Sequence, residues 1–156
     1  TRNTGGQEVI LGLRRSKMNI SDTLKLSDNA KEEIARDLVA LGGLPFYLLV
    51  LVRASIGGYM SFLSHVAIAL PVLYLLSKAV KGSDLHIARA LILVVFTSIF
   101  YGALPFTIFS TLVWCGMIYA LVRLSKSAGE ILKGIALGAV SVVISYALTL
   151  LLFPVK

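Results

Sequence analysis

The stretch that decides the fold is Ala90–Val122, ALILVVFTSIFYGALPFTIFSTLVWCGMIYALV, which runs for 33 residues without a charged side chain. One membrane-spanning helix needs only about 20 apolar residues, so this run is too long for a single span. It contains Gly102 and Pro105, and residues of these two types together favour a break between helices. The run therefore predicts two helices, near residues 88–103 and 106–122, joined by a short turn.

Three further stretches carry no charge: Leu38–Val52, Ala54–Ser77 and Gly134–Val155. Hydrophobic residues make up 57% of the chain and charged residues 15%, whereas soluble domains are closer to half and a quarter. A soluble protein would show polar stripes at helical spacing in these runs, and they have none. The sequence thus predicts an all-α protein, a polytopic integral membrane helical bundle of about five transmembrane helices. The remaining three spans are expected near residues 38–53, 58–77 and 131–153.

Lysine and arginine residues are unevenly distributed between the segments that flank these spans. From the N-terminus onward the flanking segments hold 7, 1, 3, 0, 3 and 1 of them. Because positively charged loops stay on the cytoplasmic side, this alternation places the N-terminus in the cytoplasm. A four-span alternative, with residues 90–122 as one tilted helix, would put the two loops with three cations on opposite faces and spoil the alternation. The net charge of +7 is therefore interpreted as a topology signal and not as a nucleic-acid footprint.

Two regions are expected along the chain. Residues 1–36 form an N-terminal cytoplasmic segment, and residues 37–156 form the transmembrane helical domain. Ser27–Asn29 is a good N-cap cluster, and the charged residues that follow it predict a helix near residues 28–37 that lies at the membrane interface.

Two polar stretches, VKGSDLHIAR at residues 80–89 and RLSKSAGEILKG at residues 123–134, fall on the same predicted face of the membrane. Lysine and arginine side chains bind phosphate well, and a histidine beside them can act as nucleophile or general acid. The sequence therefore predicts a shared polar surface with affinity for phosphate. Its cations are Lys81, His86, Arg89, Arg123 and Lys126, and its acids are Asp84 and Glu130.

Each of these residues also has a simpler interpretation. The cations can flank spans and meet anionic lipid head groups, and Asp84 can cap the helix that begins near His86. His65 lies inside a predicted span, where an ionisable group is costly and often functional. The simpler alternative is a histidine that is hydrogen-bonded to a neighbouring helix or to interfacial water.

Three short stretches resemble the type 2 phosphatidic acid phosphatase (PAP2) superfamily of membrane-embedded enzymes. They are ARDLVALGG at 35–43, KGSDLHIAR at 81–89 and RLSKSAGEILKGIALG at 123–138, the last being the most specific. The resemblance implies a helical bundle that removes phosphate from lipid or polyprenyl phosphates at one membrane face. It implies no metal and no cofactor, and it implies membrane lipids as partners, in the plasma membrane of a prokaryote.

Residue by residue, the resemblance implies that Lys81, Arg89 and Arg123 bind the phosphate. His86 would be the catalytic histidine, and Glu130 matches the acid that orients the family's last histidine. The place of that last histidine is filled by Lys126 or falls in a gap, and Lys126 would add to phosphate binding. Ala90 stands where the family has proline after the arginine.

The alternative is a non-catalytic membrane protein that binds lipid head groups or serves as a subunit of a homo-oligomer or membrane complex. The chain has only two histidines, His65 and His86, and this scarcity keeps the alternative open. A small transporter or channel is the weakest of the three readings, because no span interior carries an acid or a base besides His65.

Overall fold

The break predicted inside Ala90–Val122 is present in the computed structural model, which describes residues 29–124 and 126–152. Helix α4 (Leu85–Tyr101) ends at Gly102, whose φ of 57° lies in the left-handed region that glycine adopts without strain. Helix α5 (Leu104–Arg123) then begins with Pro105 in its first turn, where the missing amide proton costs nothing. The two helices are thus separate, and the single tilted helix of the four-span alternative is wrong.

The other described helices are α2 (Leu44–Ile56), α3 (Met60–Ala79), α6 (Ala128–Leu152) and an N-terminal helix, Asn29–Ala40. The first span, expected near residues 38–53, is interrupted, because the chain leaves the helix at residues 41–43 before α2 starts. Gly43 is the extended N-cap of α2, and Pro45 occupies its first turn. The helix expected near residues 28–37 is confirmed from Asn29 onward, and residues 1–28 lie outside the described part of the chain.

Three described helices, α3, α5 and α6, are long and apolar enough to cross a membrane. A fourth span results if the helix Asn29–Ala40 and α2 are counted together as one broken span. At 17 residues, α4 is about 25 Å long, shorter than the ~30 Å hydrocarbon core. Large apolar side chains such as Leu49, Leu75, Leu112 and Val143 are mostly exposed, as expected of surfaces that face lipid. Within residues 29–124 and 126–152, the protein is thus a helical bundle in which three helices, or four spans with the broken pair, are compatible with crossing a membrane by length and composition.

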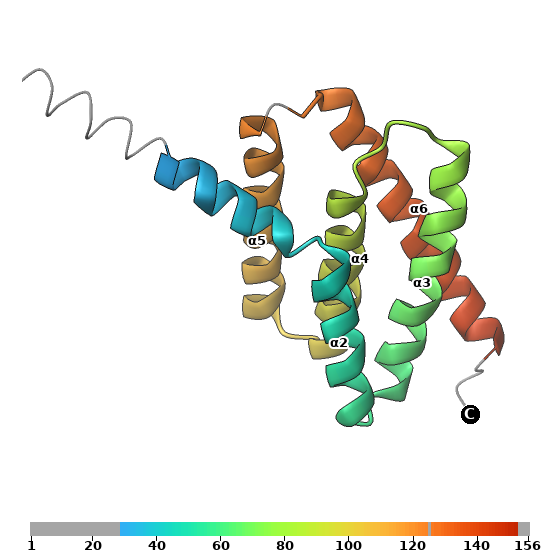
Figure 1. Ribbon diagram of the computed structural model, residues 1–156. Coiled ribbons are helices and arrows are strands. Elements are labelled where there is room, and N and C mark those ends of the chain that lie inside the picture. The colour runs from blue at the N-terminus through green and yellow to red at the C-terminus, as the bar shows by residue number, and fades with distance from the viewer. Residues whose placement is uncertain (1–28, 125, 153–156) are drawn as a thin grey trace, which may run out of the picture. The chain divides into compact units, whose positions relative to one another are not determined.

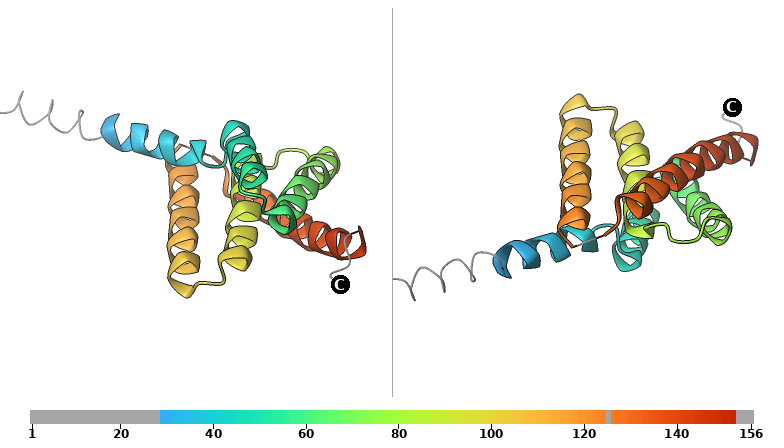
Figure 2. Two further views of the ribbon diagram at one scale, coloured as in Figure 1. Left: turned by 90° about the horizontal axis from the view of Figure 1, so that it is seen from below. Right: turned by 90° about the horizontal axis from the view of Figure 1, so that it is seen from above.

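The short helix α4 is the centre of the packing from Ala35 onward, where the described residues form one compact unit. It contacts α2, α3, α5 and α6, and Figure 2 shows α5 on one side of it with α3 and α6 on the other. It also contributes a large share of the buried side chains. These are Ile87, Ala88, Ala90, Ile92, Leu93 and Phe96.

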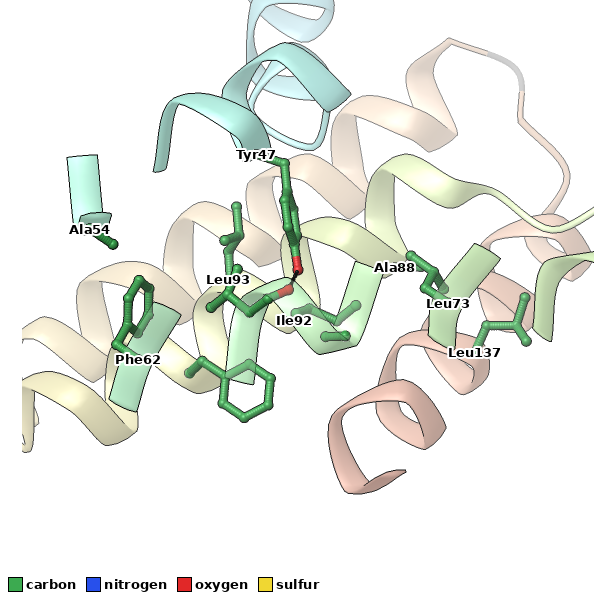
Figure 3. Packing of buried hydrophobic residues seen from close by; sticks show 11 residues of the cluster. Tyr47, Ala54, Phe62, Leu73, Ala88, Ile92, Leu93 and Leu137 are labelled. Carbon is green, nitrogen blue, oxygen red and sulfur yellow. Dashed lines mark hydrogen bonds between the residues drawn. The ribbon is translucent and has the colours of Figure 1, made fainter. Parts of the chain in front are cut away.

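A buried tyrosine connects α2 to α3 in this core (Figure 3). The hydroxyl of Tyr47 donates a hydrogen bond of 2.7 Å to the carbonyl oxygen of Val66, and neither residue is exposed. A buried phenol needs such a partner, because an unsatisfied hydroxyl in an apolar core is costly. The bond fixes α2 against the middle of α3.

Two glycines allow α6 to approach α4 closely. A Cβ atom on Gly134 would collide with the carbonyl oxygen of Asp84 and with Ile87 Cγ2, which would lie 2.6 Å away. A Cβ on Gly138 would lie 2.9 Å from the carbonyl oxygen of Ala88. Small residues at helix contacts in membranes permit this kind of backbone approach, and here they bring the start of α6 beside the start of α4.

Candidate functional site

The two polar stretches singled out in the sequence meet at the same end of the helices (Figure 1). The backbone amide of Asp84 donates a hydrogen bond of 3.0 Å to the carbonyl oxygen of Glu130. Lys133 Nζ lies 3.5 Å from the carbonyl oxygen of Lys81, which adds a second link between the stretches. We call the surface formed by Lys81, Asp84, His86, Lys126 and Glu130 the loop surface.

Asp84 is the buried anchor of the loop surface. Its Oδ1 accepts the backbone amides of His86 at 2.9 Å and Ile87 at 3.2 Å, and its side chain is 2% exposed. Aspartate is a preferred N-cap because its carboxylate satisfies amides that have no partner inside the helix. The cap interpretation of Asp84 is therefore confirmed, and the carboxylate is fixed at the first turn of α4.

The side chains of Lys126 and His86 lie close to this carboxylate. Lys126 Nζ is 3.9 Å from Asp84 Oδ2 and 3.9 Å from Glu130 Oε2, so it bridges both acids. His86 Nδ1 is 3.6 Å from Asp84 Oδ1, which is close but too long for a good hydrogen bond. The His86 side chain is the main cause that lowers the pKa of Asp84, the two capping amides lower it further, and burial opposes them. Asp84 is thus an ionised carboxylate at neutral pH.

His86 is the part of the loop surface best placed to react. Its side chain is 47% exposed, and Nδ1 is the ring nitrogen nearest to Asp84. A carboxylate beside Nδ1 favours the tautomer with the proton on that nitrogen, which leaves Nε2 as a bare lone pair on the outer side of the ring. A nucleophile oriented by an acid is the arrangement that covalent catalysis requires.

The two arginines of the predicted site are directed elsewhere. Arg89 Nε donates a hydrogen bond of 2.7 Å to the carbonyl oxygen of Gly42, in the turn that precedes α2. Arg123 Nε donates one of 2.9 Å to the hydroxyl of Tyr119, with its guanidinium 5.6 Å from the centre of that ring. The structure therefore brings His86 and Lys126 to the Asp84 carboxylate and Glu130 to Lys126. Lys81 lies three residues before Asp84, and its carbonyl oxygen faces Lys133, while Arg89 and Arg123 are engaged in other contacts.

Sequence reasoning did not assign Lys133 to the site, although it lies three residues after Glu130 and therefore on the same side of α6. It also missed an apolar pocket of about 330 Å³ lined by α2, α4 and α5. The signal for this pocket is present in the sequence as residues spaced three and four apart. On α4 they are Ala90, Leu93, Val94 and Thr97, and on α5 they are Phe106, Phe109, Ser110, Val113, Trp114 and Met117.

The α4 stripe that lines this pocket continues to the loop surface. His86 precedes Ala90 by four residues and Leu93 by seven, so it belongs to the same side of the helix. On α5 the stripe covers eleven residue steps, which is about 16 Å of helix and about half of the hydrocarbon core. Ala90 is the pocket-lining residue of α4 nearest to His86, one helical turn after it, and His86 itself does not line the pocket.

His65 does not belong to the loop surface. Its ring lies 5.2 Å from that of Phe96, which is ten residues after His86 on α4 and therefore about 15 Å further along that helix. The two histidines of the chain consequently occupy separate sites. Among the described residues, no three His, Cys, Asp or Glu side chains are close enough to hold a metal ion.

Removing the Asp84 charge tests how far it stabilises the fold. At neutral pH we expect Asp84→Asn, which keeps the cap, to lower the free energy of unfolding by about 1–2 kcal/mol. Asp84→Ala, which loses the cap as well, should cost about 1 kcal/mol more. Because the folded-state pKa of Asp84 is lowered, its contribution is present above the unfolded-state pKa and is lost as the pH falls through the folded-state value.

Thermal unfolding of the variants in detergent, followed by circular dichroism, measures both effects. The difference between wild type and Asp84→Asn should shrink as the pH falls below about 4. Ser83→Ala is the control, since Ser83 bonds only locally, to the carbonyl oxygen of Val80. A constant difference across that pH range would contradict a charge-based role for Asp84.

Comparison of the chain with models of known protein families, with curated proteins and with solved structures gave no match.

Proposed function

We propose that the protein acts on the phosphate group of a membrane lipid at the loop surface, as a phosphatase related to the PAP2 superfamily. The observation that carries the proposal is the contact between buried Asp84 and exposed His86, with Lys126 beside both acids. Lys81 and Lys126 would attract the phosphate, and His86 Nε2 would attack the phosphorus atom and displace the lipid oxygen, which would take a proton from water. A water molecule would then cleave the new bond between phosphorus and His86, which releases phosphate and restores the free histidine. In this proposal the loop surface faces the cytoplasm of a prokaryotic cell, as does the N-terminus.

The apolar pocket supports a substrate with a long hydrocarbon chain. A chain that lies along Leu93, Val94 and Val113 would extend from the interior of the bundle toward His86, which stands at the end of the same α4 stripe. The pocket buries apolar surface, so it favours a lipid phosphate over a free one. The substrate class is therefore a lipid or polyprenyl phosphate, with its phosphate at the loop surface.

A specific observation favours the alternative of binding without hydrolysis. The PAP2 mechanism uses two histidines, and the separation of about 15 Å between Phe96 and His86 along α4 keeps His65 away from the loop surface. Arg89 and Arg123 are also engaged with Gly42 and Tyr119. A non-catalytic protein that binds lipid head groups would need only the lysines of the loop surface.

The test is phosphate release by the purified protein from three substrates: dioleoyl phosphatidate, a polyprenyl diphosphate and inorganic pyrophosphate. We expect release from the two lipids and at least about tenfold less from pyrophosphate, because it lacks a chain to fill the pocket. Arg123→Ala should reduce release if Arg123 turns to the phosphate on binding. Retention of lipid phosphates without release would establish the binding alternative. If the protein neither releases phosphate nor retains lipid phosphates in preference to phosphatidylcholine, the proposal is overturned.

A further inference from the structure

His65 has one ring nitrogen with a hydrogen-bond partner and one without. Nδ1 lies 2.6 Å from the carbonyl oxygen of Ser61, one turn earlier on α3. Nε2 is buried, and no polar atom of the described residues lies within hydrogen-bonding distance of it. Buried polar atoms in native proteins nearly always have a partner, so this nitrogen requires an explanation.

The partner of Nδ1 determines what Nε2 can accept. A carbonyl oxygen only accepts hydrogen bonds, so Nδ1 carries the proton. In the neutral ring, Nε2 then has a free lone pair and can only accept a hydrogen bond. Two aromatic rings from other helices pack near the ring of His65. Its centre lies 5.2 Å from that of Phe96 on α4 and 5.4 Å from that of Tyr146 on α6. Nε2 is thus a fixed acceptor that needs a donor.

A pocket of about 60 Å³ adjoins this ring, lined by side chains of α3, α4 and α6. Its walls are mostly hydrocarbon and aromatic, including Phe62, Ile99 and Phe100, and none of its lining residues is acidic. A cationic donor such as an ammonium group would therefore lack a counter-charge. The volume is well above the 10–15 Å³ that one water needs and below the roughly 150 Å³ of a cavity that holds benzene. A small donor group with a few attached carbon atoms fits these limits.

The pocket lies at the end of the helices opposite to the loop surface. His65 is five residues after Met60, the first residue of α3, and is therefore about 7.5 Å from that end of the helix. Neutral amphiphiles place a hydroxyl group at this shallow depth and their hydrocarbon below it. The lining also contains the hydroxyl side chains of Ser61 and Tyr146, so a water molecule, which needs two to four polar partners, is the competing occupant that the experiment must separate from an alcohol.

We propose that His65 Nε2 and the surrounding aromatic side chains form a binding site for the hydroxyl group of a neutral membrane alcohol. The hydroxyl donates its hydrogen bond to Nε2, and the adjoining carbons contact Phe62, Phe96 and Phe100. The site is independent of the loop surface and of any reaction there.

The chain has only two histidines, so nitrogen NMR of protein labelled with ¹⁵N-histidine in phosphatidylcholine nanodiscs gives a direct test. The variant His86→Gln removes the other histidine's signals and identifies those of His65. We expect 1-decanol to shift the Nε2 resonance of His65 in a saturable way. Decyl methyl ether, a control of similar chain length that has no donor, should leave it in place. Dioleoylglycerol and a polyprenol then distinguish glycerolipid from isoprenoid alcohols.

Two outcomes would overturn the site. Equal shifts from the alcohol and the ether would show that hydrocarbon alone perturbs the ring, and no shift up to the solubility limit of decanol would show that no alcohol binds. Phe100→Leu replaces one aromatic ring of the pocket lining with a smaller aliphatic side chain and leaves His65 unchanged. It should weaken the binding of decanol several-fold. This variant keeps the histidine and therefore keeps the readout.

Discussion

Replacing His86 with glutamine is expected to reduce phosphate release from a lipid phosphate by at least about a thousandfold. Glutamine retains polarity and similar length but lacks the lone pair with which Nε2 would attack phosphorus. Loss of a nucleophile removes an interaction that exists only in the transition state, so kcat should fall while KM changes little. Initial rates over a range of phosphatidate concentrations separate the two constants.

The second histidine provides a matched control for this experiment. His65→Gln makes the same chemical change about 15 Å further along the bundle, and it should keep the rate within a few-fold of wild type. Retention of phosphatidate by His86→Gln would show that the variant is folded and binds its ligand. A His86→Gln protein that releases phosphate at the wild-type rate would place the nucleophile elsewhere and remove the main support of the phosphatase proposal.

Replacing Gly134 with valine is expected to lower the free energy of unfolding by about 2–3 kcal/mol, the upper range for overpacking. The new side chain would collide with the backbone carbonyl of Asp84 and with Ile87, and a backbone atom cannot turn away as a flexible side chain can. Helix α6 would have to move away from α4. This movement would also stretch the bond between the Asp84 amide and the Glu130 carbonyl, which is 3.0 Å in the native fold.

Gly129→Val is the matched control, because it makes the same substitution on the same helix. A Cβ there has only Ser127 Oγ nearby, at an ordinary contact distance of 3.6 Å. The measurement is the midpoint of thermal unfolding in detergent for the two variants. Equal midpoints would mean that the contact between α4 and α6 is looser than the structure indicates.

The positions of the helices could be predicted from the sequence, because uncharged runs and their breaks are local properties. Gly102 and Pro105 ended one helix and began the next as expected. The meeting of the two polar stretches followed from the alternation of charge, which needs no knowledge of packing. The first span near residues 38–53 is interrupted by a turn at Gly42 and Gly43, and the polarity of the sequence does not change at this turn.

Side-chain directions in the candidate site could not be predicted in the same way. Arg89 bonds a carbonyl that lies 47 residues away in sequence, and that carbonyl became available only because the chain turns at Gly42. Arg123 was expected to face a phosphate, whereas a tyrosine one helical turn earlier holds it in the structure. The spacing of apolar residues on α4 and α5 marks the lining of the apolar pocket, but the volume of the pocket depends on the distance between α2 and these two helices, which no local pattern encodes.

The central place of α4 has a consequence for biosynthesis. The ribosome makes α4 before α6, so the small-residue side of α6 that α4 packs against does not yet exist when α4 enters the membrane. Until α6 is made, the short helix α4, with His86 and Arg89 near its first turn, can be stabilised only by contacts with the helices made earlier, such as α3, or with the insertion machinery. Loss of α6 in a shortened product would therefore expose the faces of α3 and α4 that pack against α6.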